Sequence, residues 1–171
     1  MQSFFIGVSA FLISFYTLQF QDIDGNTISM SSFQGKKVLI VNFATGSARI
    51  NQLNGLKDLQ QQFHDSLVII AFPSNSFGRE PRTNSEIKAF CDSAFTPNFI
   101  IAAKTIVKGD SIHPLFGWFA DAAKNGDQSV TIINDYQKLL VSPNGSFVGV
   151  ISPKLNPMDS IVVAAINRVY E

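Results

Sequence analysis

Few side chains in this 171-residue chain could act as a nucleophile, a base or a metal ligand. Cys91 is the only cysteine, so an intramolecular disulfide, a CxxC redox pair and a cysteine-rich zinc site are all excluded. The two histidines, His64 and His113, are far apart in the sequence, and we interpret them as surface or helix-capping residues. The sequence therefore predicts no metal site, and we expect no cofactor.

Ser47 stands between an apolar run and a helical pattern, where a hydrolase can carry its nucleophile. In the nucleophile elbow that serine lies within Gly-x-Ser-x-Gly, but Thr45 and Arg49 occupy the glycine positions here. Residues 46–49 could also hold an anion, although they lack the Gly-Lys-Ser/Thr ending of a nucleotide-binding loop. We interpret Ser47 or a neighbour as a cap of the following helix, a role that contributes ~1 kcal/mol.

Composition and charge indicate one folded domain. Hydrophobic residues make up 46% of the chain, which is enough to build a core without disulfides or metals. Lysine plus arginine and aspartate plus glutamate each number 13, so the formal net charge is zero. Because nucleic-acid binding relies on a positive field, we expect no nucleic acid among the partners.

The N-terminus is apolar from residue 4 to residue 16. This run is too short for a bilayer span, which needs ~20 residues, but it has the size of a signal-peptide core. The first basic residue is Lys36, so no charged segment precedes the run. We expect no membrane span, and the sequence leaves open whether residues 1–13 are a leader and whether the protein is cytoplasmic or exported to the periplasm.

The first half of the chain is typical of a hairpin followed by a strand–helix–strand unit. Residues from about Ser14 alternate as in a strand, and a turn signal at 24–26 predicts a partner strand at 27–30. The apolar runs 38–44 and 67–72 do not alternate, which is typical of parallel strands covered on both faces. Apolar residues at helical spacing between these runs predict a helix over 53–63.

The second half adds helices and short strands. Thr83 and Glu86 have the spacing of a capping box and predict the start of a second helix. Pro157 at a first helical position predicts the start of the last helix, which should turn Ile161, Val162, Ala165, Ile166 and Val169 toward the core. The other expected elements are a helix at 112–124 and strands or extended runs at 99–102, 130–133, 138–141 and 146–151.

This element order predicts the fold class. A βαβ unit followed by a ββα unit, without internal repeats, is typical of an α/β fold with a thioredoxin-like mixed β-sheet flanked by helices. The N-terminal β-hairpin precedes it. We expect residues 14–171 to form this fold as a single domain.

Eight short motifs follow one another between residues 14 and 170. They are DIDGN (22–26), GKKVLIVNFA (35–44), FPSNSFG (72–78), EP (80–81), EIKAFC (86–91), VKG (107–109), HPL (113–115) and KLLVSPNG (138–145). Together they resemble the glutathione peroxidases. The resemblance implies a thioredoxin-fold peroxidase of the oxidative-stress response that reduces hydroperoxides with glutathione or thioredoxin as partner.

The family's reaction begins at a cysteine or selenocysteine at the start of the first long helix, whose amides stabilise the attacking thiolate. The family motif Asn-Val-Ala-Ser-x-Cys-Gly aligns with residues 42–48, which places Ser47 at the peroxidatic position. A serine hydroxyl does not ionise usefully near neutral pH and cannot form a sulfenic acid. The resemblance therefore implies that the nucleophile is missing.

Gln, Trp and Asn complete the family's catalytic tetrad, and these positions are altered as well. The Gly-x-Gln-Glu-Pro segment is shortened to residues 78–81 and loses its glutamine. The Trp-Asn-Phe motif falls on residues 134–136, so Asn134 and Asp135 stand at tetrad positions. If the family fold holds, both residues lie near Ser47 and make the former pocket more polar.

Cys91 lies at, or within one residue of, the resolving cysteine of thioredoxin-dependent members, but it has no peroxidatic partner. We interpret it as a small apolar residue on the inner face of the second helix.

Two hypotheses follow: a peroxidase-inactive member whose scaffold binds a partner or small ligand, or an active hydroperoxide reductase that uses Cys91. The short segment 124–130 lacks the assembly loop of tetrameric members, and we expect a monomer.

Overall fold

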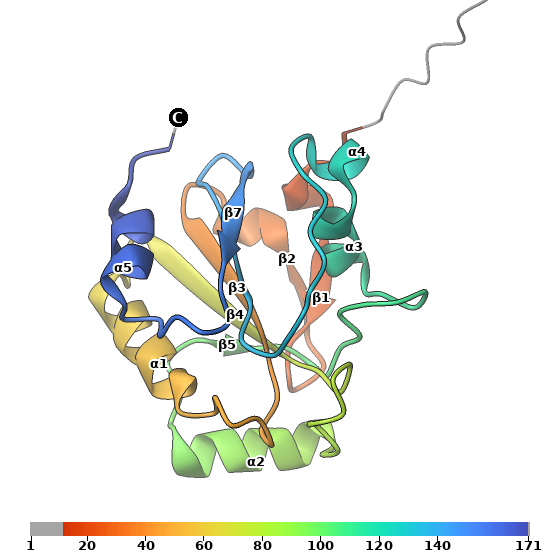
Figure 1. Ribbon diagram of the computed structural model, residues 1–171, viewed down its shortest axis with the longest axis vertical. Coiled ribbons are helices and arrows are strands. Elements are labelled where there is room, and N and C mark those ends of the chain that lie inside the picture. The colour runs from red at the N-terminus through yellow and green to blue at the C-terminus, as the bar shows by residue number, and fades with distance from the viewer. Residues whose placement is uncertain (1–11, 171) are drawn as a thin grey trace, which may run out of the picture.

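A five-stranded mixed sheet separates two layers of helices in the computed structural model, which describes residues 12–170 (Figure 1). The strand order is β5-β4-β3-β6-β7, with β3, β4 and β5 parallel and β6 and β7 antiparallel to their neighbours. Ile40 in the central strand pairs with Ile70 on one side and Leu139 on the other. The strands are β3 (Lys37–Phe43), β4 (Leu67–Pro73), β5 (Ile100–Ile101), β6 (Lys138–Val141) and β7 (Phe147–Ile151).

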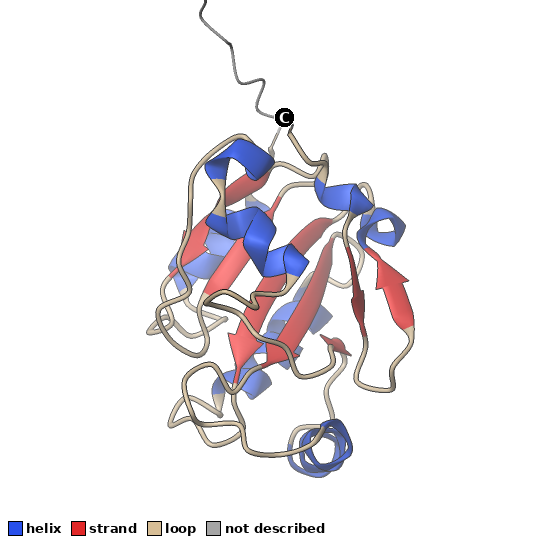
Figure 2. Cartoon of the chain, turned by 90° about the vertical axis from the view of Figure 1, so that its right-hand side faces the viewer, coloured by secondary structure: helices blue, strands red, loops and turns tan. Residues whose placement is uncertain are grey.

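The N-terminal hairpin forms a separate two-stranded sheet, which Figure 2 shows beside the main sheet. Its turn is closed by Asp22, whose Oδ1 accepts hydrogen bonds from the amides of Asp24 (3.0 Å) and Asn26 (2.8 Å). The first strand begins later than the alternation predicts, because the Ser14 side chain caps a 3-10 turn. The elements are η1 (Phe15–Thr17), β1 (Gln19–Gln21), β2 (Thr27–Ser29) and η2 (Met30–Phe33).

Helices cover both faces of the sheet. Helices α1 and α5 lie on one face, α3 and α4 lie on the other with the hairpin, and α2 runs across one end of the sheet (Figure 1). The capping box of Thr83 and Glu86 is present at the start of α2, as predicted. The bounds are α1 (Gln52–Gln62), α2 (Asn84–Ala94), α3 (Pro114–Ala120), α4 (Ala122–Asn125) and α5 (Ser160–Asn167).

The central strand is buried on both faces, which explains its unbroken apolar sequence. Val38 and Ile40 pack into the core under α3, whereas Leu39 and Val41 pack into the core under α1 and α5. All four side chains have zero exposure. The prediction of a thioredoxin-like mixed sheet with parallel buried strands is thus confirmed.

Residues 130–133, expected as a short extended run, are not assigned to any strand of the described sheets. Val130 and Ile132 are buried. The Gln137 side chain accepts a hydrogen bond from the Ile133 amide (3.0 Å) and donates one to the Thr131 carbonyl (3.1 Å). A side chain therefore satisfies backbone groups that a sheet partner would otherwise satisfy.

The expected helix over 112–124 is divided in two at Asp121. This residue is extended (φ −131°, ψ 105°), and its carboxylate accepts a hydrogen bond from the Ala123 amide and so caps α4. Aspartate competes well for such a cap because its short side chain reaches the backbone. Gly126 ends α4 in the left-handed conformation, in agreement with the prediction.

The last helix begins at Ser160 rather than at Pro157. Asp159 is its N-cap and accepts from the Ile161 amide (3.0 Å), so the residues before it form a turn. Val162 and Ile166 are buried as expected. Ile161 and Val169 are 64% and 84% exposed, so their predicted place in the core is wrong.

Residues 1–13, for which the sequence leaves a leader role open, lie mostly outside the described residues. Of the last two of them, Ile13 joins the fold: its amide donates to the Lys124 carbonyl (2.9 Å), and its carbonyl accepts from the Trp118 indole (2.6 Å). Among residues 12–170, no helix is long and apolar enough to cross a bilayer.

Candidate functional site

Ser47 lies in the connection from β3 to α1, at the carboxyl end of the central strand. Its side chain is nearly buried; its Oγ accepts a hydrogen bond from the Arg49 amide (3.3 Å), and its carbonyl accepts one from the Ile50 amide (3.1 Å). Helix α1 begins only at Gln52, after an N-cap residue without a side-chain hydrogen bond. The expectation that Ser47 or its neighbour caps α1 is wrong, because Ser47 caps the turn that precedes the helix.

An ion pair lies beside this turn. Arg79 Nη1 donates to Asp135 Oδ2 (2.6 Å) and to Asn134 Oδ1 (3.0 Å). The Asp135 side chain is fully buried, whereas the Arg79 side chain is 43% exposed. The fold therefore places an arginine on the two residues that stand at altered tetrad positions.

The same arginine contacts the turn that holds Ser47. Its carbonyl accepts a hydrogen bond from the Gly46 amide (3.1 Å), and a Cβ on Gly46 would lie 2.7 Å from that oxygen, so no larger residue fits without a shift. Arg79 thus links the turn at 46–47 to residues 134 and 135. Within the described residues, Ser47 is connected to Asn134 and Asp135 only through this residue: the Arg79 main chain bonds to Gly46, next to Ser47, and the Arg79 side chain bonds to Asn134 and Asp135.

The end of β3 holds the loop that contains Asn134 and Asp135. Asn42 Nδ2 donates to the Asn134 carbonyl (3.1 Å), and the Tyr136 amide donates to the Asn42 carbonyl (2.6 Å). Tyr136 has a positive φ of 68°, which is unusual for a residue with a bulky side chain. These contacts fix the backbone on which the Asp135 carboxylate is mounted.

Three buried polar atoms at this end of the sheet have no hydrogen-bond partner among residues 12–170: Asn42 Oδ1, Asp135 Oδ1 and the Tyr136 hydroxyl. Burial also raises the pKa of Tyr136, so the phenol stays protonated. Such groups usually find a protein partner or an ordered water. The interior next to Ser47 is therefore polar, as the sequence predicts.

A second buried carboxylate, Glu80, acts like Asp135 on Tyr136 and was not singled out as buried from the sequence. Glu80 is fully buried, and its two oxygens accept from the Thr45 amide (2.6 Å) and the Thr45 hydroxyl (2.8 Å). Arg82 Nη1 donates to the same hydroxyl. Glu80 and Arg79 stand in the segment 78–81, which the sequence singled out for its EP motif and its lost glutamine but not for a buried carboxylate.

Cys91 is fully buried on the inner face of α2, where the apolar interpretation placed it. Burial, together with the charges of Glu80 and Asp92, raises the pKa of the Cys91 thiol to about 12, and Arg82 opposes this only partly. The group is thus a protonated thiol near neutral pH. Within residues 12–170, no hydrogen bond or ion pair connects its side chain to Ser47.

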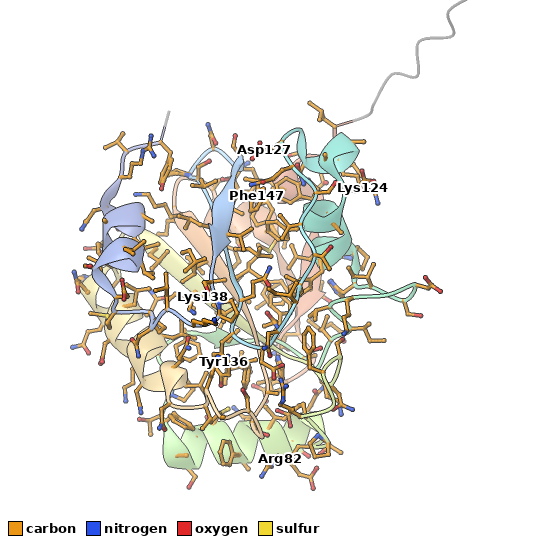
Figure 3. All side chains as sticks on the ribbon, viewed as in Figure 1. Arg82, Lys124, Asp127, Tyr136, Lys138 and Phe147 are labelled. Atoms are coloured by element: carbon orange, nitrogen blue, oxygen red, sulfur yellow. The ribbon has the colours of Figure 1, made fainter. Side chains whose placement is uncertain are left out.

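Lys138 is a further charged residue that the sequence did not single out by itself. It is fully buried in β6, and its Nζ donates to Gln52 Oε1 (2.8 Å), the Tyr136 carbonyl (3.0 Å) and the Leu155 carbonyl (2.8 Å) (Figure 3). Burial and the nearby Arg49 lower its pKa to about 8. Lys138 ties β6 to α1 and to the loop before α5.

One histidine caps a helix and the other lies on the surface, as expected from the sequence. His113 caps α3, since its Nδ1 accepts from the Leu115 amide (3.2 Å), and burial lowers its pKa. His64 is exposed and lies 3.0 Å from an Asp65 oxygen. Within the described part of the chain, no group of three or more His, Cys, Asp and Glu side chains could hold a metal ion.

Comparison with known proteins decides the family. The family model for glutathione peroxidase matches residues 15–120, more than half of the chain. The chain belongs to the glutathione peroxidase family. The resemblance of the eight motifs is therefore confirmed.

Relatives from bacteria and yeast agree with this family. The glutathione peroxidase homolog BsaA of Bacillus subtilis is 32% identical over 149 residues, which cover 86% of this chain and 93% of the relative. The glutathione peroxidase-like peroxiredoxin gpx1 of Schizosaccharomyces pombe is 35% identical, and the match covers 78% of this chain and 85% of the relative. The thioredoxin/glutathione peroxidase BtuE of Escherichia coli is 28% identical, and the match covers 90% of this chain and 95% of the relative.

Solved structures support the fold. The crystal structure of Trgpx in its apo form matches with a TM-score of 0.66 at 24% identity and covers 91% of this chain and 97% of that one. A thioredoxin-family thiol:disulfide interchange protein from Chlorobium tepidum matches with a TM-score of 0.63 at 17% identity, and the match covers 92% of this chain and 98% of that protein. The family's thioredoxin-like fold is thus present in this chain.

Proposed function

We propose that this chain is a peroxidase-inactive member of the glutathione peroxidase family, which keeps the scaffold for binding a partner or a small ligand. The observation that carries the proposal is Ser47 at the carboxyl end of β3, beside the Arg79–Asp135 ion pair. In the family reaction a thiolate sulfur attacks a peroxide oxygen, the O–O bond breaks, and a sulfenic acid and an alcohol or water form. A serine oxygen cannot take up this oxidation.

The environment of Ser47 also differs from that of an activated nucleophile. Helix α1 begins at Gln52, five residues further along the chain, so Ser47 is not in the first turn of that helix, where the unpaired amides of the helix would stabilise an anion. The nearby cation, Arg79, is bonded to Asp135 and Asn134 rather than free to stabilise an anion. Both features support a site without peroxidase chemistry.

The alternative function, hydroperoxide reduction by Cys91, is opposed by the same structure. A peroxidatic thiol must be accessible and largely ionised near neutral pH. Cys91 has zero exposure, and its raised pKa keeps it protonated. Its use would require α2 to leave the core, because Ile87 and Cys91 are the two buried residues of that helix.

Cys91 is expected to resist oxidation in the folded protein. After mild hydrogen peroxide treatment of the native protein, intact-mass spectrometry should show no oxygen added to the thiol over minutes, because the thiol is buried and protonated. The same treatment in denaturant should oxidise it, and Cys91→Ser serves as the matched control. Rapid oxidation of the native protein to a sulfenic acid, lost in Cys91→Ser, would instead support the alternative function.

Ser47→Cys is expected not to restore hydroperoxide turnover. The new thiol would be almost buried, would lie near the Asp135 carboxylate and would lack the family's glutamine and tryptophan donors. The rate of a coupled NADPH assay should stay at the level of the unchanged protein. If Ser47→Cys gains turnover with thioredoxin or glutathione, the pocket is intact and only its nucleophile has been lost, contrary to this account.

The partner class is proposed from the relatives. The Escherichia coli relative is named a thioredoxin/glutathione peroxidase, so a thioredoxin-type protein or glutathione is the first partner to test for binding without turnover. A monomeric state and the role of residues 1–13 stay predictions of the sequence.

A further inference from the structure

A groove of about 380 Å³ lies apart from Ser47, between the loop after β4 and the loop after β5. Two hydrogen bonds hold the loops together: the Thr105 amide donates to the Pro73 carbonyl (2.8 Å), and the Val107 amide donates to Ser76 Oγ (3.1 Å). The groove lies beyond the carboxyl ends of parallel strands, where ligands commonly bind in α/β folds. Its lining residues are Asn75, Ser76, Lys104, Thr105, Ile106 and Lys108.

Each lysine of the groove is exposed, and its ammonium group makes one contact with the protein. Lys104 Nζ donates one hydrogen bond to the Arg82 carbonyl (2.7 Å), which leaves two of its N–H groups free. Lys108 Nζ lies over the Phe77 ring, 4.2 Å from its centroid, in a cation–π contact. Such a contact reduces the freedom that an ammonium group loses when an anion binds.

The Ser76 hydroxyl offers a further donor. The Ser76 oxygen accepts two hydrogen bonds, one from Ser74 Oγ in the same loop (3.0 Å) and one from the Val107 amide (3.1 Å). The Ser76 O–H has no acceptor among residues 12–170. The O–H is thus available to a ligand oxygen.

No lining residue is a carboxylate, so the positive charge of the two lysines is not neutralised inside the groove. Glu86 is close enough to Lys104 for the lysine to contribute to the lowered pKa of that carboxyl group. However, Glu86 Oε2 is engaged in the capping box, where it accepts from the amide and hydroxyl of Thr83 (2.8 and 2.7 Å). An external anion is therefore the complementary ligand.

We propose that this groove binds a small phosphate monoester. Two ammonium groups and a free hydroxyl match the several acceptor oxygens of a dianionic phosphate better than a single carboxylate. Ile106, which is 49% exposed, supplies an apolar contact for the organic part of the ester. The proposal is independent of peroxidase chemistry at Ser47.

Titration followed by backbone amide NMR tests this site, with phenyl phosphate, inorganic phosphate and benzoate as separate probes. Phenyl phosphate should shift the amides of residues 75–76 and 104–108 saturably and should bind more tightly than either other probe. Lys108→Gln should weaken that binding about tenfold, which is the loss of one charge-assisted hydrogen bond. Lys154→Gln, at an exposed lysine outside the groove, is the matched control and should bind as the natural protein does.

Lys108→Gln is the decisive variant because Lys108 makes no hydrogen bond within residues 12–170 and lies on an exposed loop, so the fold should be unaffected. Unchanged thermal unfolding verifies this. The proposal is overturned if the shifts lie elsewhere, if Lys154→Gln weakens binding as much as Lys108→Gln, or if benzoate or inorganic phosphate binds as tightly as phenyl phosphate.

Discussion

Replacing Lys138 with methionine is expected to lower the free energy of unfolding by about 2–4 kcal/mol. Methionine replaces the unbranched chain of lysine as far as Cε but lacks Nζ and donates no hydrogen bond, so the acceptors on Gln52, Tyr136 and Leu155 lose their donor. An unsatisfied buried acceptor costs about 1–3 kcal/mol. Part of the cost of these unsatisfied acceptors is offset because the substitution also removes a buried charge.

The pH dependence of stability gives an independent signature of Lys138. Its pKa is about 8 in the folded protein and ~10.4 in an unfolded chain, so the unfolded state binds the proton more tightly. The contribution of this group to stability therefore rises between about pH 8 and pH 10, by at most ~1.4 kcal/mol per pH unit. Below pH 8 the lysine is protonated in both states, and the slope vanishes.

Denaturant unfolding at several pH values from 7 to 10 measures both effects. The difference in stability between the natural protein and Lys138→Met should grow as the pH rises through this window. Lys154→Met, at an exposed lysine, should change stability by less than about 0.5 kcal/mol. A Lys138→Met protein as stable as this control, or a constant difference over the whole range, contradicts the burial argument.

Arg79→Met should destabilise the protein by about 2–4 kcal/mol. The substitution leaves the fully buried Asp135 carboxylate without its cationic partner. Breaking a fully buried pair costs ~3–5 kcal/mol, but the Arg79 side chain is 43% exposed, and solvent screens part of the interaction. Thermal or denaturant unfolding measures the loss.

A second substitution shows whether the loss comes from an unpaired charge. Asp135→Asn in the Arg79→Met background removes that charge and should recover part of the lost stability. In the natural background, Asp135→Asn should instead destabilise, because Arg79 loses its anionic partner. If Asp135→Asn is equally destabilising in both backgrounds, the two residues are not coupled, and the ion pair does not organise this site.

Local sequence patterns predicted much of the fold because each is governed by nearby residues. The unbroken apolar run 38–44 predicted a doubly covered central strand, and Thr83 with Glu86 predicted the start of α2. The hairpin turn at 24–26 was equally local, since Asp22 closes it within four residues.

The errors arose where a polar side chain competes for the backbone. Asp121 interrupts the third helix, and Asp159 caps α5 two residues after the proline start signal, so that the helix begins at Ser160. Propensity alone does not decide between two plausible caps. The outcome depends on which backbone amides the rest of the fold leaves free.

The candidate site was predictable only in part. Motif alignment placed Ser47, Asn134 and Asp135, and in the structure Arg79 connects the turn at 46–47 to the other two. Arg79 escaped notice because its partner Asp135 is 56 positions away, and no local pattern connects them. The burial of Lys138 likewise depends on contacts with α1 and the loop before α5.

The absence of peroxidase turnover is the central claim, and coupled NADPH oxidation tests it most directly. The purified protein is assayed with hydrogen peroxide and with an organic hydroperoxide, once through thioredoxin and thioredoxin reductase and once through glutathione and glutathione reductase. This account predicts a rate equal to that without the protein in every arm. A hydroperoxide-dependent rate that disappears in Cys91→Ser would contradict it and would identify Cys91 as the nucleophile.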